Sequence, residues 1–278
     1  MIKHYIGKLG EFDYNTTEYA VKEDIGGNEY LNYIGMGENV RLPSGCISCY
    51  RMFFDYPFPK LDLSEFDTSE VISMKQMFKS AKRLEQINVS SFDTSKVQTM
   101  SYMFQDCTCL EYVDLSNFDT RNLTIVSYMF SGCKSLRGIQ FSHNFFKEVI
   151  VAESMFFNCR QLQEIDLSSF EKNRGVVNLN KMFEFCISLK TIDMSYIDRQ
   201  SIYDSDFMFE RCDLLESVSL AGKDYSSEIQ ISNIARVFGR VLSLKYLELN
   251  RDAKILLEDD IELGKLKMYR SDSYDKTL

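Results

Sequence analysis

The chain has little of the residue type on which much enzyme chemistry depends, because His4 and His143 are its only histidines among 278 residues. A catalytic triad or a histidine-rich metal site is hard to assemble from two such residues. The sequence also has no Gly-x-Ser-x-Gly motif, and Gly35-Met-Gly37 lacks the third glycine of a phosphate-binding loop. We therefore expect a protein that is not an enzyme and uses no cofactor.

Long apolar runs and an excess of positive charge are also missing. No uncharged stretch approaches the length of a membrane span, and the first nine residues lack the apolar run of a signal peptide. The 32 basic and 41 acidic residues give a formal net charge of −9, which disfavours a phosphate-backbone partner. Eight cysteines without an export signal indicate reduced thiols. We expect a cytoplasmic protein that binds neither membrane nor nucleic acid directly, or a cell-surface protein if a leader was removed.

What the sequence does contain is a repeat of about 26 residues, a length that suits a leucine-rich repeat. Its clearest mark is a Met-Phe pair, with Val237-Phe238 as an eighth, variant copy. Leucine stands six residues after most of these Phe residues, and two more apolar columns stand nine and eleven residues after them. The seven pairs are Met52-Phe53, Met77-Phe78, Met103-Phe104, Met129-Phe130, Met155-Phe156, Met182-Phe183 and Met208-Phe209.

Each repeat divides into a strand segment and a helical segment. The phrase Leu-x-x-Ile-x-Leu ends in an alternation typical of a short strand with one buried face. Upstream, a spacing of three and four predicts a short helix that Thr94 and Ser95 can cap, with these residues on one face: Val97, Met100, Met103, Phe104 and Cys107. The sequence therefore predicts an α/β solenoid of about eight leucine-rich-repeat-like units, with a parallel sheet on one side and short helices on the other.

The predicted solenoid needs caps, because one repeat alone cannot bury enough apolar surface to be stable. We expect an N-terminal β cap over residues 1–42 and the solenoid over residues 43–250. A C-terminal β cap and tail are expected over residues 251–278, with residues 271–278 loose.

Cys46 and Cys49 have the spacing of half a zinc site or of a redox pair. The repeat favours another interpretation, because Cys46 shares a column with Val71, and Cys49 shares one with Met74. We therefore predict that both cysteines fill the core. The cysteines that follow the repeated Phe by three residues are likewise expected at a small buried position, whereas Cys109 leaves the pattern and is expected to be exposed.

The outward positions of the predicted strands form the concave face that solenoids often use for binding. Asp166 beside Asp193 would place like charges on neighbouring strands, which is unfavourable unless a basic partner faces them. Six residues are candidate partner-binding residues: Tyr112, Asp114, Glu164, Asp166, Asp193 and Tyr246. Alternatively, the rows of Asp and Ser hydrogen-bond along the ladder as a feature of the scaffold.

The phrase Asp114-Leu-Ser-Asn-Phe-Asp-Thr120, followed by Val126-Ser-Tyr-Met-Phe-Ser-Gly-Cys-Lys-Ser-Leu136, resembles the BspA-like leucine-rich-repeat surface proteins of bacteria, mycoplasmas and some protists. The resemblance runs from about Cys46 to about Asn250 and implies adhesion or protein binding without a cofactor. Two N-terminal phrases look like those of short intracellular members carried by phages and mobile elements: Gly7-Lys-Leu-Gly-Glu-Phe-Asp-Tyr and Arg41-Leu-Pro-Ser-Gly-Cys.

From these observations we expect a protein–protein interaction module whose concave acidic sheet receives a basic surface of a protein partner. Three alternatives stay open. The chain is a cell-surface adhesin without its leader, a mobile-element protein that inhibits a host nucleic-acid-binding enzyme by acidic mimicry, or a purely structural repeat.

Overall fold

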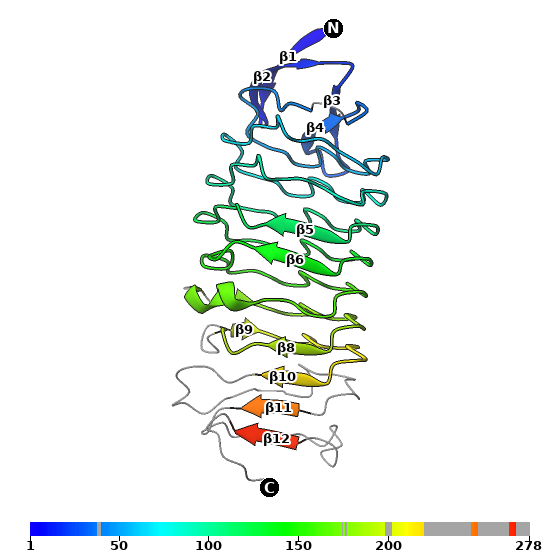
Figure 1. Ribbon diagram of the computed structural model, residues 1–278. Helices are drawn as coiled ribbons and strands as arrows, with labels where there is room; N and C mark the ends of the chain where they lie inside the picture. The colour runs from blue at the N-terminus through cyan, green and yellow to red at the C-terminus, as the bar shows by residue number, and fades with distance from the viewer. Residues whose placement is uncertain are drawn as a thin grey trace.

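In the computed structural model, the described residues that follow the N-terminal segment form a stack of coils (Figure 1). It describes residues 1–37, 40–173, 175, 177–197, 202–219, 246–249 and 267–270. Val237-Phe238 lies outside the described residues, and so does the predicted C-terminal cap apart from one strand.

Two antiparallel hairpins precede the coils, formed by β1 (Ile2–Gly7) with β2 (Gly10–Asn15) and by β3 (Tyr19–Glu23) with β4 (Glu29–Tyr33). Backbone hydrogen bonds join each hairpin to the first coil. The N–H of Ile47 donates to the oxygen of Leu9 at 2.9 Å, and the N–H of Tyr33 donates to the oxygen of Met52 at 2.7 Å. The predicted N-terminal cap thus contains two hairpins, while its boundary at residue 42 stays a prediction.

Parallel strands line one side of the stack. β5 (Tyr112–Leu115) pairs with β6 (Gly138–Phe141), and side chains along β5 alternate between exposed and buried as the sequence predicted. A second parallel sheet contains β8 (Thr191–Asp193), β10 (Ser217–Ser219), β11 (Tyr246–Leu249) and β12 (Lys267–Arg270). We call the outward surface of β5, β6, residues 163–167, β8 and β10 the strand face.

A second ladder of parallel contacts joins the coils at another place. This ladder includes the pair of strands β7 (Val177–Asn178) and β9 (Ile202–Asp204). Its other members are isolated bridges whose partners lie 25 to 27 residues apart. The bridged residues, in order along the stack, are Ser48, Ser73, Thr99, Ile125, Val151 and Asn178.

The predicted short helices are wrong. Within the described ranges the only helix is η1 (Ser168–Lys172), a 3-10 helix. The segments around the repeated Phe residues are instead successive tight turns, in which the residues two before and two after the Phe have positive φ. We call these segments the turn ribbon: residues 49–56, 74–81, 100–107, 126–133, 152–159, 179–186 and 205–212.

Hydrogen bonds between neighbouring coils stabilise the turn ribbon. The bonds of one coil to the next are Met74 N–H to Thr99 O at 3.0 Å, Gln76 N–H to Ser101 O at 2.9 Å, Phe78 N–H to Met103 O at 2.8 Å and Ser80 N–H to Gln105 O at 2.7 Å. A non-glycine residue with positive φ costs about 1–2 kcal/mol. Each hydrogen bond contributes about 0.5–1.5 kcal/mol, which offsets this cost.

The core lies between the strands and the turn ribbon. The residues for which the helix was predicted are buried there, so their predicted inward face is confirmed although their backbone is not helical. The repeated Phe rings stack from coil to coil, as between Phe78 and Phe104, whose centroids are 5.1 Å apart and whose planes differ by 8°. The thiol of Cys107 donates to the carbonyl oxygen of Phe78 at 3.1 Å, so the cysteine column also links coils.

Candidate functional site

The strand face carries an open depression of about 630 Å³. Four of the six candidate residues line it, namely Tyr112, Glu164, Asp166 and Asp193. The other lining residues are Arg137, Gly138, Ile139, Ile165, Thr191, Ile192, Ser217 and Ser219. The structure therefore gathers most of the residues that the sequence suggested from separate repeats, and surrounds them with apolar and hydroxyl-bearing side chains.

Gly138 helps to create the depression because it contributes no side chain where the neighbouring coils carry Tyr112 and Glu164. A Cβ atom at Gly138 would lie 3.5 Å from Cδ2 of Tyr112, so the tyrosine ring stands beside the vacant position. Tyr112 is 53% exposed, although it is an aromatic residue on a regular strand. Its ring is thus available to a partner.

The sheet is interrupted at the same place. β6 and β8 belong to different sheets, and the coil between them, which carries Glu164 and Asp166, is part of neither. Ile165 on this coil is only half-buried, whereas Ile192 in the equivalent position of β8 is buried. Part of the Ile165 side chain therefore remains accessible at the floor of the depression.

The rim has an excess of negative charge. Glu164, Asp166 and Asp193 contribute three carboxylates, and Arg137 contributes one guanidinium. All four residues are exposed, so their field reaches solvent and is screened by salt beyond about 10 Å. An approaching cationic group would be attracted, because the carboxylates outnumber the guanidinium.

The aspartates of this column also shape the backbone. Oδ1 of Asp166 accepts a hydrogen bond from the N–H of Ser168, and Oδ1 of Asp193 accepts one from the N–H of Ser195, both at 2.8 Å. The expectation that the Asp and Ser rows bond along the ladder is corrected here, because these bonds close turns within one coil. Each carboxylate keeps a second oxygen, so a scaffold role and a binding role are compatible.

The two remaining candidate residues are Asp114, which does not line the depression, and Tyr246. Asp114 is exposed on β5, where Oδ1 accepts a hydrogen bond from the N–H of Ser116 at 2.9 Å. Hydrogen bonds from the hydroxyl and the backbone of Ser116 lower the pKa of this carboxyl. Tyr246 lies opposite Ser217 in the pairing of β11 with β10, and its side chain is outside the described part of the structure.

Sequence reasoning missed Arg137 and the apolar floor. Arg137 directly precedes the column of outward residues and was not considered as part of it. Gly138 was the available signal, because a glycine within a column of larger side chains leaves a hollow. Ile139 and Ile165 could not be recognised, since their column is apolar in every repeat and the sequence does not show in which coils it is only partly buried.

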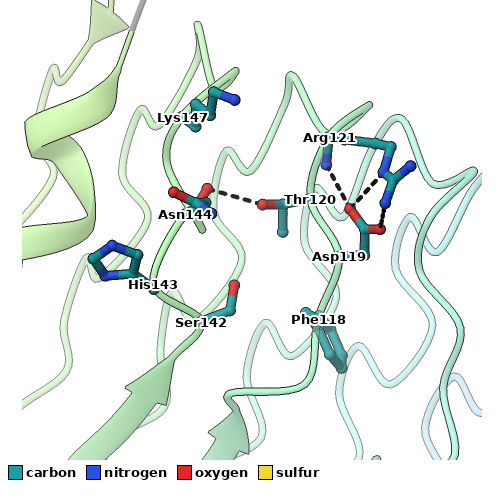
Figure 2. Close-up of a pocket in the computed structure, with 8 residues that line it drawn as sticks. All are labelled: Phe118, Asp119, Thr120, Arg121, Ser142, His143, Asn144 and Lys147. Atoms are coloured by element: carbon teal, nitrogen blue, oxygen red, sulfur yellow. Dashed lines mark hydrogen bonds and ion pairs between the residues drawn. The ribbon is translucent and has the colours of Figure 1, made fainter.

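A second depression, of about 450 Å³, lies between residues 118–121 and residues 142–147. Figure 2 shows the guanidinium of Arg121 turned toward Asp119, with Nε–Oδ1 and Nη2–Oδ2 distances of 3.0 and 2.6 Å. Nζ of Lys147 lies 3.9 Å from a carboxylate oxygen of Glu148. Its lysine and arginine each face a carboxylate, so this depression has no comparable charge excess and indicates no ligand.

The cysteines occupy the places expected for them. Cys46 and Cys49 are buried and unpaired, which confirms that they fill the core, and Cys109 is exposed as predicted. Burial raises the pKa of the Cys46 thiol to about 11. Within the described ranges, no three metal-ligating side chains gather in one place. Over the same ranges, no helix combines the length and apolar character needed to cross a bilayer.

Comparison with known proteins gives a family and a distant similarity to solved structures. The sequence profile of DUF285, described as a Mycoplasma protein of unknown function, matches residues 47–170 and 146–241, which together make up more than half of the chain. Among curated proteins no sequence matches. The crystal structure of a TLR13–ssRNA13 complex is similar over 73% of this chain, with 16% identity and a TM-score of 0.32. The chain spans 32% of the length of that protein.

Proposed function

The chain belongs to the DUF285 family, a leucine-rich-repeat-like family, and we propose that this member is a non-enzymatic module that binds a protein partner through its strand face. The observation that supports the proposal is the convergence of Tyr112, Glu164, Asp166 and Asp193 on one depression. The partner offers a basic surface, and no cofactor takes part.

The composition of the depression fits a protein interface. Exposed tyrosine is a common anchor of such interfaces, because its ring buries a large area with few rotatable bonds. Isoleucine side chains on the floor add apolar contact, and the carboxylates at the rim add selectivity for positive charge. Hydrogen bonds between coils hold the backbone around this surface, so little ordering is needed when a partner binds.

The proposal is tested by affinity capture from two lysates, one of the organism that makes the protein and one of its host, using three forms of the chain. The first is the wild type and the second is the rim variant Glu164→Gln, Asp166→Asn, Asp193→Asn. Asn keeps the oxygen that accepts the turn hydrogen bond but removes the charge. The third is the control variant Glu65→Gln, Asp67→Asn, Asp93→Asn, which removes three exposed charges outside the depression.

We expect the wild type and the control variant to capture the same protein and the rim variant to lose it. The captured protein should carry a cluster of lysine or arginine and should elute as salt rises. Capture that is equal for all three folded forms would contradict the proposal. The partner also decides where the module works: a host nucleic-acid-binding enzyme supports the mobile-element role, and an external host protein supports the BspA-like adhesin role.

A further inference from the structure

The depression combines two chemistries, because its floor is apolar and its rim is charged. Ile139 and Ile165 stand in the inward column of the strand face, yet both are only half-buried. In the same column Val113 and Val218 have no exposed surface. The floor therefore offers aliphatic surface to a ligand on two adjacent coils, whereas the coils on either side of them bury Val113 and Ile192.

Because Gly138 has no side chain, a group from outside can reach the floor of the depression at this position. The glycine lies between the exposed Tyr112 ring on one side and the coil of Glu164 and Ile165 on the other. A side chain from outside can enter here without displacing one of the protein's own. It would meet the tyrosine ring and the isoleucines along its length, and the carboxylates near its end.

We propose that the depression receives one long basic side chain, lysine or arginine, from an exposed segment of the partner. The aliphatic stem of such a residue lies on Ile139 and Ile165, and its cationic head reaches the carboxylates of the rim. Tyr112 adds an aromatic ring to which a cation is attracted. An uncharged aliphatic side chain contacts the floor but is not attracted by the carboxylates of the rim. This assignment rests on the proposed function, because it specifies the group that the partner must present.

Methyl NMR on the full chain labelled at the isoleucine δ1 carbon tests the assignment directly. The probes are Nα-acetyl-lysine amide and Nα-acetyl-arginine amide, with Nα-acetyl-norleucine amide as the uncharged probe of similar stem. Basic probes should shift the methyl signals of Ile139 and Ile165 in a saturable way. The signals of Ile72 and Ile150, which are exposed but do not line the depression, should not move. The norleucine probe should bind at least about tenfold more weakly.

Two variants control the experiment. Glu164→Gln with Asp193→Asn should abolish the saturable shifts while leaving the methyl spectrum of the folded protein otherwise unchanged. Asp67→Asn with Asp93→Asn removes the same number of charges outside the depression and should leave binding as it is. The lysine and arginine probes, compared with each other, show which head group the rim prefers.

Equal shifts with the norleucine probe, or no shift at Ile139 and Ile165 with either basic probe at its solubility limit, would overturn the assignment. Failure of the proposed function can be distinguished from failure of this assignment. If the rim variant loses a captured protein but the basic probes do not bind, the strand face binds its partner in another way. If the probes bind but no captured protein depends on the rim, the proposed function is the part that is wrong.

Discussion

Gly132 and Asp106 stand next to each other on neighbouring coils of the turn ribbon, so closely that a Cβ atom on Gly132 would collide with Oδ1 of Asp106. Gly132 has a φ of 76°, and Ser80 occupies the equivalent place two coils earlier with a φ of 63°. The same left-handed position is thus filled by glycine in one coil and by a larger residue in another.

This relationship gives a test that separates the turn ribbon from a helix by the sign of the effect. In a helix, Gly132→Ala would stabilise the protein by about 1 kcal/mol. In the turn ribbon it should lower the free energy of unfolding by about 1 kcal/mol or more, because alanine is strained at positive φ. Ser80→Gly should raise it, by up to about 1 kcal/mol. Urea denaturation of both variants measures the two signs, and reversed signs would restore the helical interpretation.

The turn made by Asp166 predicts different results for two substitutions at one position. Asp166→Ala removes the acceptor for the N–H of Ser168 and should lower the free energy of unfolding by about 0.5–1.5 kcal/mol. Asp166→Asn keeps the acceptor oxygen and should change stability less. Thermal and urea denaturation measure both. Equal losses for the two variants would show that charge, and not the turn hydrogen bond, is what this residue contributes to the fold.

Thiol reactivity should distinguish one cysteine from the other seven. Cys109 is exposed, whereas the remaining cysteines are buried, and burial raises the pKa of the Cys186 thiol to about 12. A thiolate is the reacting species, so buried thiols react slowly. Ellman's reagent should modify one thiol per native chain and eight after denaturation. Cys109→Ser should remove the rapid reaction of the native chain. If a second thiol reacts rapidly in the native chain, one of the cysteines described as buried is accessible to the reagent.

Stability should fall in acid, and the aspartate turns should contribute to this fall. Hydrogen bonds from Ser69 and Ser116 hold the pKa values of Asp67 and Asp114 below their ordinary range in the folded chain. The unfolded chain therefore binds protons at a higher pH than the folded one. The stabilisation is present above the unfolded value of about 3.9 and is lost as the pH falls through the lower folded values. Urea denaturation between pH 6 and 2.5, values chosen to span this window, should show a shallower decline for Asp67→Asn with Asp114→Asn than for the wild type.

The residues that could be predicted from sequence are those whose role is set by burial. Every central repeat has the same residue types at the positions of Phe104, Cys107 and Leu110. A position that is apolar in every copy has to face the core in every copy. The same register places four residues of the depression on the outward side of the strands, although it contains no contact between their coils. The register also argues against a metal site at Cys46 and Cys49, because both cysteines fall in apolar columns.

The sequence by itself determined which side chains face inward, since the period of the repeat and the apolar columns leave one consistent arrangement. The tertiary structure decided the backbone that carries them. A spacing of three and four returns residues to one face in a helix and in a run of tight turns alike, so Met100, Met103 and Phe104 could not tell the two apart. The positive φ of Tyr102 is tolerated because its N–H bonds to Ser127 of the next coil at 2.9 Å, and such a bond exists only once the coils are stacked. The partial exposure of Ile139 and Ile165 likewise depends on how neighbouring coils pack, which no single repeat shows.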